Sequence, residues 1–328
     1  MGKWARWLVR LIGPALLVLF LWRTDWNALL SQFGSIAWWP VVVSMLLMPP
    51  FVAIKAWRWN LLMRELGLDA PPLGYAIVLY TIGLFLGGTT PGQSGDFIKA
   101  WYLRDRGLAL PPVLFSIVLD RLFDFLVMAL LALLTLVAFI NLLPESAITA
   151  TIVFAGLIII VTPLLMARRS REWLMTRTLP FAPQRIRIVV ERWRDQFATL
   201  SLRPGLLMLL VLASVGSAVA TMLRIYLLYL ALPLDNVPLL AIISSTALIA
   251  LLQALPISFA GIGVRDAVLI AVLAQYGYEK ELAIILSALF LLLNIEHIII
   301  GFLVSLRYPL GTPPETVAQI EGAEPTAR

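Results

Sequence analysis

Apolar runs that are long enough to cross a lipid bilayer recur along this chain of 328 residues. A transmembrane helix needs roughly 20 predominantly apolar residues. Only 13% of the residues are charged, whereas soluble domains carry about 25%. The sequence therefore predicts an all-α polytopic membrane protein with about six full transmembrane helices. We expect these spans at Leu11–Trp22, Trp38–Trp57, Val113–Ile140, Ile148–Met166, Leu206–Leu232 and Ala283–Leu306.

The composition excludes several classes of site. The chain has no cysteine and one histidine, His297, so disulfides, thiolate zinc sites and multi-histidine metal sites are excluded. The net charge of +6 comes from bases beside apolar runs, where they orient helices and meet anionic lipid rather than nucleic acid. We expect no metal and no cofactor. His297 follows Glu296, and the pair is either packed structurally or takes part in a proton relay or ligand site.

Two stretches break the rules for a membrane helix. Gly87–Lys99 contains four glycines and a proline and ends in an acid and a base. Pro256–Asp266 has the same character. Irregular backbone at membrane depth is tolerated only where it is buried in protein or lines a cavity. We therefore predict two re-entrant hairpins made of broken helices.

The distribution of bases orients the chain. Lys3, Arg6 and Arg10 precede the first apolar run, which resembles a secretory signal but lacks a convincing cleavage site, so we expect a retained helix with a cytoplasmic N-terminus. Residues 167–203 hold nine arginines against three acids and should also be cytoplasmic. Four full spans, an even number, connect the cytoplasmic N-terminus to this cytoplasmic loop, so the first broken stretch is not a fifth crossing. We therefore predict that it enters from the cytoplasm and returns there. The second enters from outside if the C-terminus is cytoplasmic.

The two halves of the chain also match at a constant offset of about 166 residues. This offset places Arg58 on Arg224, and it aligns the Leu-Asp-x-x-Pro-Leu segments that begin at Leu68 and Leu234. It also aligns Gly95-x-x-x-Lys99 with Gly261-x-x-x-Arg265. Because the orientation argument runs the second span inward and the fifth outward, we predict an inverted-topology repeat, as in many secondary transporters.

The predicted organisation has five segments. They are an N-terminal helix and interfacial segment (1–37), a first repeat with the cytoplasm-entering hairpin (38–166), a basic cytoplasmic loop (167–204), a second repeat with the externally entering hairpin (205–308), and a flexible cytoplasmic tail (309–328).

Three motifs carry a family resemblance. They are Pro91-Gly-Gln-Ser-Gly-Asp-Phe-Ile-Lys99, Asp120-Arg-Leu-Phe-Asp124 and Pro256-Ile-Ser-Phe-Ala-Gly-Ile-Gly-Val-Arg-Asp266. With them the chain, over roughly residues 5–306, resembles the integral-membrane, flippase-like domain of the lysylphosphatidylglycerol synthases (the multiple peptide resistance factor type). The resemblance is to the stand-alone form without the synthetase domain. Asp96 and Asp266 stand where the family more often has Glu, and Ala260 replaces a glycine.

The resemblance implies lipid translocation in the bacterial cytoplasmic (inner) membrane. The residues that we expect to contact a lipid headgroup or phosphate are Lys99, Arg265, Asp96, Asp266, Gly95, Gly261, Gly263, Ser94 and Ser258. For Lys99 and Asp96, an ion pair that pins the hairpin is the alternative. Asp120, Arg121 and Asp124 form a charge cluster that either couples transport to protons or holds helices together. Arg58 and Arg224 either admit headgroups or extend to the interface as structural anchors.

The expected function is translocation of an anionic or aminoacylated phospholipid, or of a polyprenyl-phosphate-linked lipid, by alternating access and without enzymatic chemistry. A membrane enzyme that modifies lipids or envelope glycolipids is one alternative, with Asp96, Asp120, Asp124 and Asp266 as bases or metal ligands. A non-catalytic membrane partner of such an enzyme is the other. Besides membrane lipids, a lipid-modifying enzyme and a second copy of the chain are candidate partners.

Overall fold

The computed structural model describes residues 34, 36–136, 145–178, 184, 204–253 and 264–311. Within these ranges every regular element is a helix, which confirms the predicted all-α class. The helices are α3 (Trp38–Leu46), α4 (Met48–Glu65), α5 (Leu73–Gly88), the 3-10 helix η2 (Pro91–Phe97), α6 (Ile98–Arg104), α7 (Leu110–Leu136), α8 (Glu145–Met166), α9 (Arg168–Thr178), α11 (Pro204–Leu230), α12 (Leu239–Gln253), α13 (Val264–Gln275) and α14 (Lys280–Arg307).

Three helical segments in the described ranges are long and apolar enough to cross a membrane. They are Trp38–Glu65, Gly205–Leu230 and Lys280–Arg307. The first and third contain the expected second and sixth spans, and Gly205–Leu230 covers the expected fifth span up to Leu230. α7 and α8 cover most of the expected third and fourth spans, and α7 carries Asp120, Arg121 and Asp124 in its 27 residues. The expected first span lies outside the described residues. The protein is thus a helical membrane protein, and the number of six full spans stays a prediction.

A local break divides the segment Trp38–Glu65. α3 ends at Leu46, α4 begins at Met48, and Pro49 and Pro50 occupy the first turn of α4. Proline lacks the backbone N–H that an unbroken helix would need at these positions. The amide of Leu47 donates to the carbonyl of Val43 of α3 at 3.1 Å, and the amide of Phe51 of α4 donates to the carbonyl of Leu47 at 3.2 Å, so the two helices stay joined end to end.

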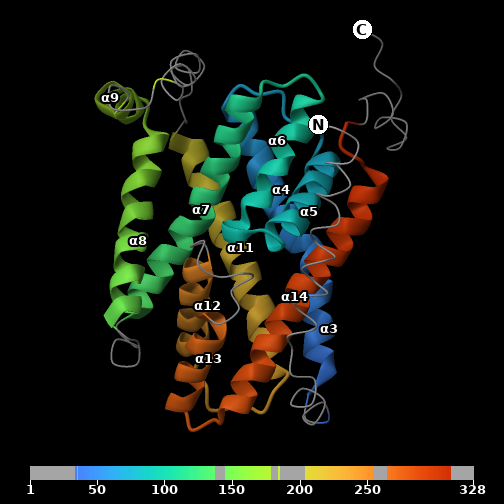
Figure 1. Cartoon of the computed structure of the whole chain (residues 1–328), viewed down its shortest axis with the longest axis vertical. Coiled ribbons are helices and arrows are strands. Elements are labelled where there is room, and N and C mark those ends of the chain that lie inside the picture. The colour runs from blue at the N-terminus through green and yellow to red at the C-terminus, as the bar shows by residue number, and fades with distance from the viewer. Residues whose placement is uncertain are drawn as a thin grey trace.

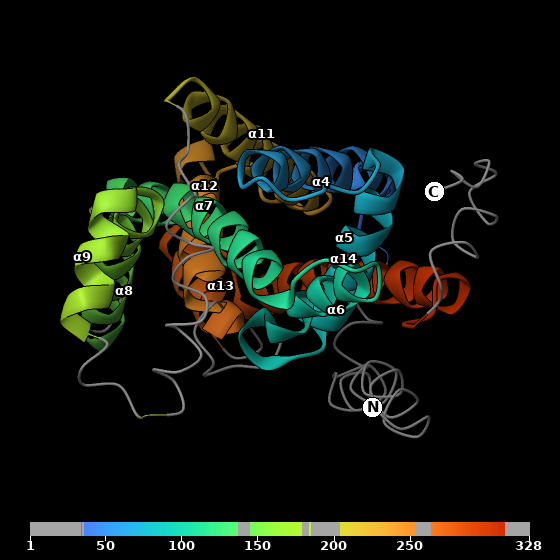
Figure 2. The ribbon, with the colours of Figure 1, turned by 90° about the horizontal axis from the view of Figure 1, so that it is seen from above.

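The shorter helices occupy opposite ends of the molecule. Figure 1 shows α5 and α6 in the upper half and α12 and α13 in the lower half, with α14 and α11 running alongside both. Seen from above, α8 and α9 lie at the periphery, and α7 runs between them and the α5–α6 region (Figure 2). α14 packs against α5 and also against α13, so it connects the two ends.

The apolar core is divided in the same way. One cluster of buried side chains comes from α11, α12, α13 and α14, with contributions from α3. A second cluster comes from α4, α5, α6 and the start of α7, with Ile298 of α14. Two further clusters combine the halves: α7 and α8 pack against α11 and α12 in one, and α4 and α7 pack against α11 in the other. The two halves are therefore joined through these buried side chains as well as through α3 and α14.

The break after α5 is held by a close approach of backbone to backbone. The hydroxyl of Thr90 donates to the carbonyl of Leu86 at 2.8 Å, and the amide of Gly95 donates to that hydroxyl at 2.6 Å. A Cβ atom on Gly95 would lie 2.1 Å from the oxygen of Leu86. Glycine is thus required here, and η2 folds directly back onto the end of α5. The predicted interruption of the helix is confirmed.

The second predicted break lies between α12 and α13. Residues 254–263, which include Pro256, Ser258, Ala260, Gly261 and Gly263, are outside the described part of the chain. The flanking helices are described, and α13 begins at Val264. Its side chains Arg265 and Asp266 can therefore be placed.

Candidate functional site

Arg58 is the centre of a buried charge network that joins α4, α7 and α11. Its Nε donates to Oδ1 of Asp120 at 2.9 Å, and its Nη1 donates to Oδ1 of Asp124 at 2.6 Å. Nη1 also donates to the hydroxyl of Ser214 at 3.1 Å. Lys55 contacts the other oxygen of Asp124 at 2.5 Å. Two bases and two acids are thus balanced, which a buried network requires because an unpaired charge in a low-dielectric interior is costly.

Lys99 lies in a second enclosed network on the hairpin. Its Nζ lies 2.8 Å from Oδ2 of Asp96, and Nε of Arg121 donates to the same oxygen at 3.0 Å. The Lys99 side chain is 0% exposed. Its ammonium lies 3.9 Å from the ring centroid of Tyr80 and 4.9 Å from that of Trp59, which are cation–π distances. The ammonium group of Lys99 is therefore enclosed by the Asp96 carboxylate and the two aromatic rings.

The packing around Asp96 and Lys99 leaves no room for a side chain at Gly83. A Cβ atom on Gly83 of α5 would lie 2.2 Å from Oδ1 of Asp96. Arg121 also donates from Nη1 to the side-chain oxygen of Gln93, whose backbone φ is +56°. Arg121 of α7 therefore binds η2 through two side chains and fixes the hairpin to the bundle.

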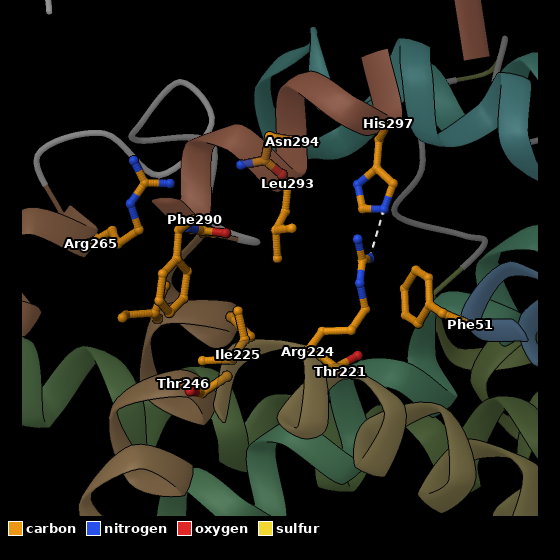
Figure 3. Close-up of a pocket in the computed structure, with 13 residues that line it drawn as sticks. Phe51, Thr221, Arg224, Ile225, Thr246, Arg265, Phe290, Leu293, Asn294 and His297 are labelled. Carbon is orange, nitrogen blue, oxygen red and sulfur yellow. Dashed lines mark hydrogen bonds between the residues drawn. The ribbon is translucent and has the colours of Figure 1, made fainter. Parts of the chain in front are cut away.

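A cavity of about 150 Å³ lies in the other half of the molecule (Figure 3). Its lining is mostly apolar and aromatic, and it includes two arginines from different helices. In Figure 3 Phe290 and Leu293 lie between Arg265 on one side and Arg224 on the other. The lining residues are Phe51, Thr221, Arg224, Ile225, Thr246, Ile249, Ala250, Gln253, Arg265, Phe290, Leu293, Asn294 and His297.

Arg224 of α11 is held by three partners. Its Nη2 donates to Oε2 of Glu296 at 2.5 Å, and its Nη1 lies 3.0 Å from Nε2 of His297. Its Nε donates to the backbone carbonyl of Ser44 at 2.9 Å. The ring of Phe51 lies beside this guanidinium and stacks on the imidazole of His297, with centroids 6.0 Å apart. These contacts connect α11 to α14 and to α3.

Arg265 of α13 is buried at 2% exposure and is less completely bonded. Its Nε donates to the hydroxyl of Ser287 at 2.7 Å, and that hydroxyl donates to Asp266. Its Nη1 is buried and has no hydrogen-bond partner among the residues that the structure describes. A guanidinium nitrogen is an obligate donor, so this atom is suited to receive an acceptor on a molecule that enters the cavity.

The predicted site residues thus fall into separate groups. Arg224 and Arg265 line one cavity, and Asp266 is linked to Arg265 through Ser287. Lys99 and Asp96 lie together in the hairpin network, near Gly95, while the side chain of Ser94 is exposed on η2. Arg58, Asp120 and Asp124 form the other network. Arg58 and Arg224, which the 166-residue offset aligns, are both buried, although one of their expected roles was to extend to the membrane interface. The predicted Ser258, Gly261 and Gly263 lie outside the described residues.

Several polar residues of the cavity were not singled out from the sequence. Thr221, Thr246, Gln253 and Asn294 lie on α11, α12 and α14. Asn294 and His297 are three residues apart in an apolar helix, which places them on one face. That spacing of two polar residues is the sequence signal from which the α14 side of the cavity could have been predicted. Among the described residues no group of three or more His, Cys, Asp or Glu side chains is placed to hold a metal ion.

The long apolar helices, the broken hairpin and the buried charged groups define a polytopic helical membrane protein. The particular family follows from a match over residues 7–301 to the family described as the lysylphosphatidylglycerol synthase TM region. Because the match spans most of the chain, the protein belongs to this family, and the resemblance is confirmed. No match was found among the curated proteins or among the solved structures.

Proposed function

We propose that the protein is a lipid translocase that moves a lipid with an anionic headgroup between membrane leaflets by alternating access. The observation that carries this proposal is the cavity lined by Arg224 and Arg265, in a family of lipid-related membrane domains. Guanidinium groups match the oxygens of a phosphate and remain charged in partly buried sites. The apolar remainder of the lining suits the glycerol and upper acyl regions of a lipid.

The helix boundaries support an inverted repeat as the basis of the motion. α5 begins at Leu73 and α12 at Leu239, which differ by 166 residues. α6 begins at Ile98 and α13 at Val264, which differ by the same number. In Figure 1 these two helix pairs occupy opposite ends of the molecule, as two hairpins that enter from opposite sides would. Repeat interfaces of this kind hold the substrate sites of many transporters.

The two halves treat their aligned bases differently, and this asymmetry fits alternating access. Lys99 is paired with Asp96 at 2.8 Å and enclosed by two aromatic rings, whereas Arg265 lines the cavity and its buried Nη1 has no hydrogen-bond partner among the described residues. If Lys99 became exposed to a cavity while Arg265 became enclosed, the site in one half would open as the site in the other half closes. The basic residues would then hold the headgroup in turn while the acyl chains stay in the bilayer.

Reconstitution into liposomes tests the proposal. We expect purified protein to accelerate the exchange of a fluorescent phosphatidylglycerol between leaflets, measured by quenching of the outer-leaflet probe. Arg265→Gln removes the open donor and should slow exchange by about tenfold or more, because a hydrogen bond to a charged group is worth roughly 1.5–3 kcal/mol. Arg104→Gln is the matched control, since its guanidinium is 49% exposed on α6.

Equal exchange rates for Arg265→Gln and the wild type would show that the cavity is not the site of headgroup binding. Failure to accelerate exchange of phosphatidylglycerol, aminoacylated phospholipids or polyprenyl phosphates would reject translocation itself. A variant that elutes as a single species at the wild-type position after detergent extraction is required for either conclusion.

A further inference from the structure

Every nitrogen of the Arg224 guanidinium already has a partner in the resting arrangement. Glu296, His297 and the carbonyl of Ser44 take the three nitrogens at 2.5, 3.0 and 2.9 Å. These bonds use three of the five N–H groups of the guanidinium, so an anion that enters the cavity competes with Glu296 and His297 for the two terminal nitrogens. The Ser44 carbonyl is backbone and cannot turn away, which makes Glu296 and His297 the partners that can exchange.

The arrangement also requires particular protonation states. A guanidinium has only donors, so Nε2 of His297 accepts the hydrogen bond and carries no proton. Oε2 of Glu296 accepts the other bond at a short distance, as an ionised carboxylate does in a charge-assisted pair. A proton on either group would weaken its bond to Arg224.

Few charged groups of the described residues lie around Glu296 and His297. Arg224 is the charged residue that acts on Glu296, and His297 lies near Arg224 and near Lys55 of α4. Lys55 is already paired with Asp124 at 2.5 Å. α3 and α5, which also pack against α14, contain no acid or base of their own apart from the tyrosines of α5.

The remaining neighbours of α14 direct their polar groups elsewhere. Arg265 and Asp266 of α13 both bind Ser287. Tyr80 of α5 donates to Asp120, and Tyr229 of α11 bonds to Ser245. Within the described part of the chain, Glu296 thus depends on Arg224 for its charge balance.

The Arg58 network differs in this respect. Asp120 contacts both Arg58 and Tyr80, and Asp124 contacts both Arg58 and Lys55. If one partner of either acid is withdrawn, another remains. Glu296 has no such second partner among the described residues, so loss of Arg224 would leave a buried carboxylate unpaired, and such a group takes up a proton rather than stay charged.

We propose that Glu296 and the lipid headgroup anion bind Arg224 alternately, so that headgroup binding takes up one proton on Glu296. This inference rests on the proposed translocation. The proton comes from the water on the side to which the cavity is open. One anionic charge enters with the headgroup and one proton enters with it, so the occupied cavity carries the same net charge as the empty one. The transported species is then a lipid monoanion together with a proton.

Binding measured in detergent tests the proton uptake without transport. For a fluorescent phosphatidylglycerol, uptake of one proton weakens binding by up to about tenfold for each unit of rising pH above the point at which Glu296 is ionised in the empty site. Glu296→Gln keeps an oxygen that can accept from Arg224 but cannot titrate, so its affinity should stay level from about pH 6 to about pH 8. Asp69→Asn is the matched control, because Asp69 is an exposed acid, and it should keep the wild-type slope.

His297→Gln separates the two titratable groups. Its side-chain oxygen can replace Nε2 as an acceptor, so a retained pH slope supports the assignment to Glu296. Loss of the slope in His297→Gln together with its retention in Glu296→Gln would overturn that assignment. A level wild-type affinity over the same pH range would overturn proton uptake altogether.

Proteoliposomes separate failure of this inference from failure of the proposed function. An imposed pH gradient should change the steady distribution of the probe between leaflets for the wild type and leave it unchanged for Glu296→Gln. If the wild type exchanges the probe but ignores the gradient, translocation stands and proton coupling is wrong. If no lipid is exchanged, translocation is wrong, and a pH-dependent affinity in detergent would still locate the exchange at Glu296.

Discussion

Replacement of Arg58 by methionine tests whether Arg58 and Arg224, which are aligned in the predicted repeat, have different roles. Arg58→Met keeps much of the side-chain length and removes four hydrogen bonds, which go to Asp120 twice and to Asp124 and Ser214 once each. The Asp120 side chain is 0% exposed, so it cannot regain hydration without a change in packing. Removal of one partner from a buried ion pair costs about 3–5 kcal/mol.

Arg224→Met is the matched comparison at the aligned position. It leaves Glu296 without its base, next to His297 of the cavity lining rather than in a closed network, so this carboxyl can become protonated. We therefore expect a smaller cost of about 1–3 kcal/mol, the penalty for an unpaired buried polar group. The difference between the two variants follows from their surroundings, since the chemical change is the same.

Unfolding in mixed micelles, with an increasing fraction of denaturing detergent, measures both costs. The double variant Arg58→Met/Asp120→Asn should recover at least about 1 kcal/mol relative to Arg58→Met, because the uncompensated charge is removed. Two results would refute the reasoning that the Arg58 network is structural and that the partners of Arg224 can exchange. One is an Arg224→Met variant that is destabilised as much as Arg58→Met, and the other is a double variant that recovers no stability.

Two further predictions concern the hairpin and the topology. Gly95→Ala places a methyl group 2.1 Å from the carbonyl oxygen of Leu86 and should destabilise the protein by about 1–3 kcal/mol or more, whereas Gly74→Ala on α5, with open space around it, should be neutral or slightly stabilising in the same unfolding assay. Because the chain has no cysteine, Asp69→Cys and Asp235→Cys report topology directly. An impermeant thiol reagent should label Asp235→Cys on intact cells and Asp69→Cys only after permeabilisation, and labelling of both from one side would contradict the inverted repeat.

Much of the helical framework could be predicted because it follows from local and additive properties. The fifth span was expected at Leu206–Leu232 and α11 extends over Pro204–Leu230. The last span was expected at Ala283–Leu306 and α14 extends over Lys280–Arg307. Apolar length sets such helices, because the hydrocarbon core admits few other backbone structures. The glycines and Pro91 likewise predicted the break after α5.

The sequence by itself determined the class of protein, the family, the helix break after α5 and the identity of the charged residues that matter. Only the tertiary structure decided which charges are paired with one another. The spacing of Asp96 and Lys99 allowed either an ion pair or a headgroup site, and the fold encloses them with Arg121 and Tyr80. Glu296 and His297 were neighbours in a helix, and the fold brings Arg224 to both, 72 and 73 residues away in the chain. Pairing of buried charges depends on contacts between distant helices, and the periodicity of a single segment does not encode them.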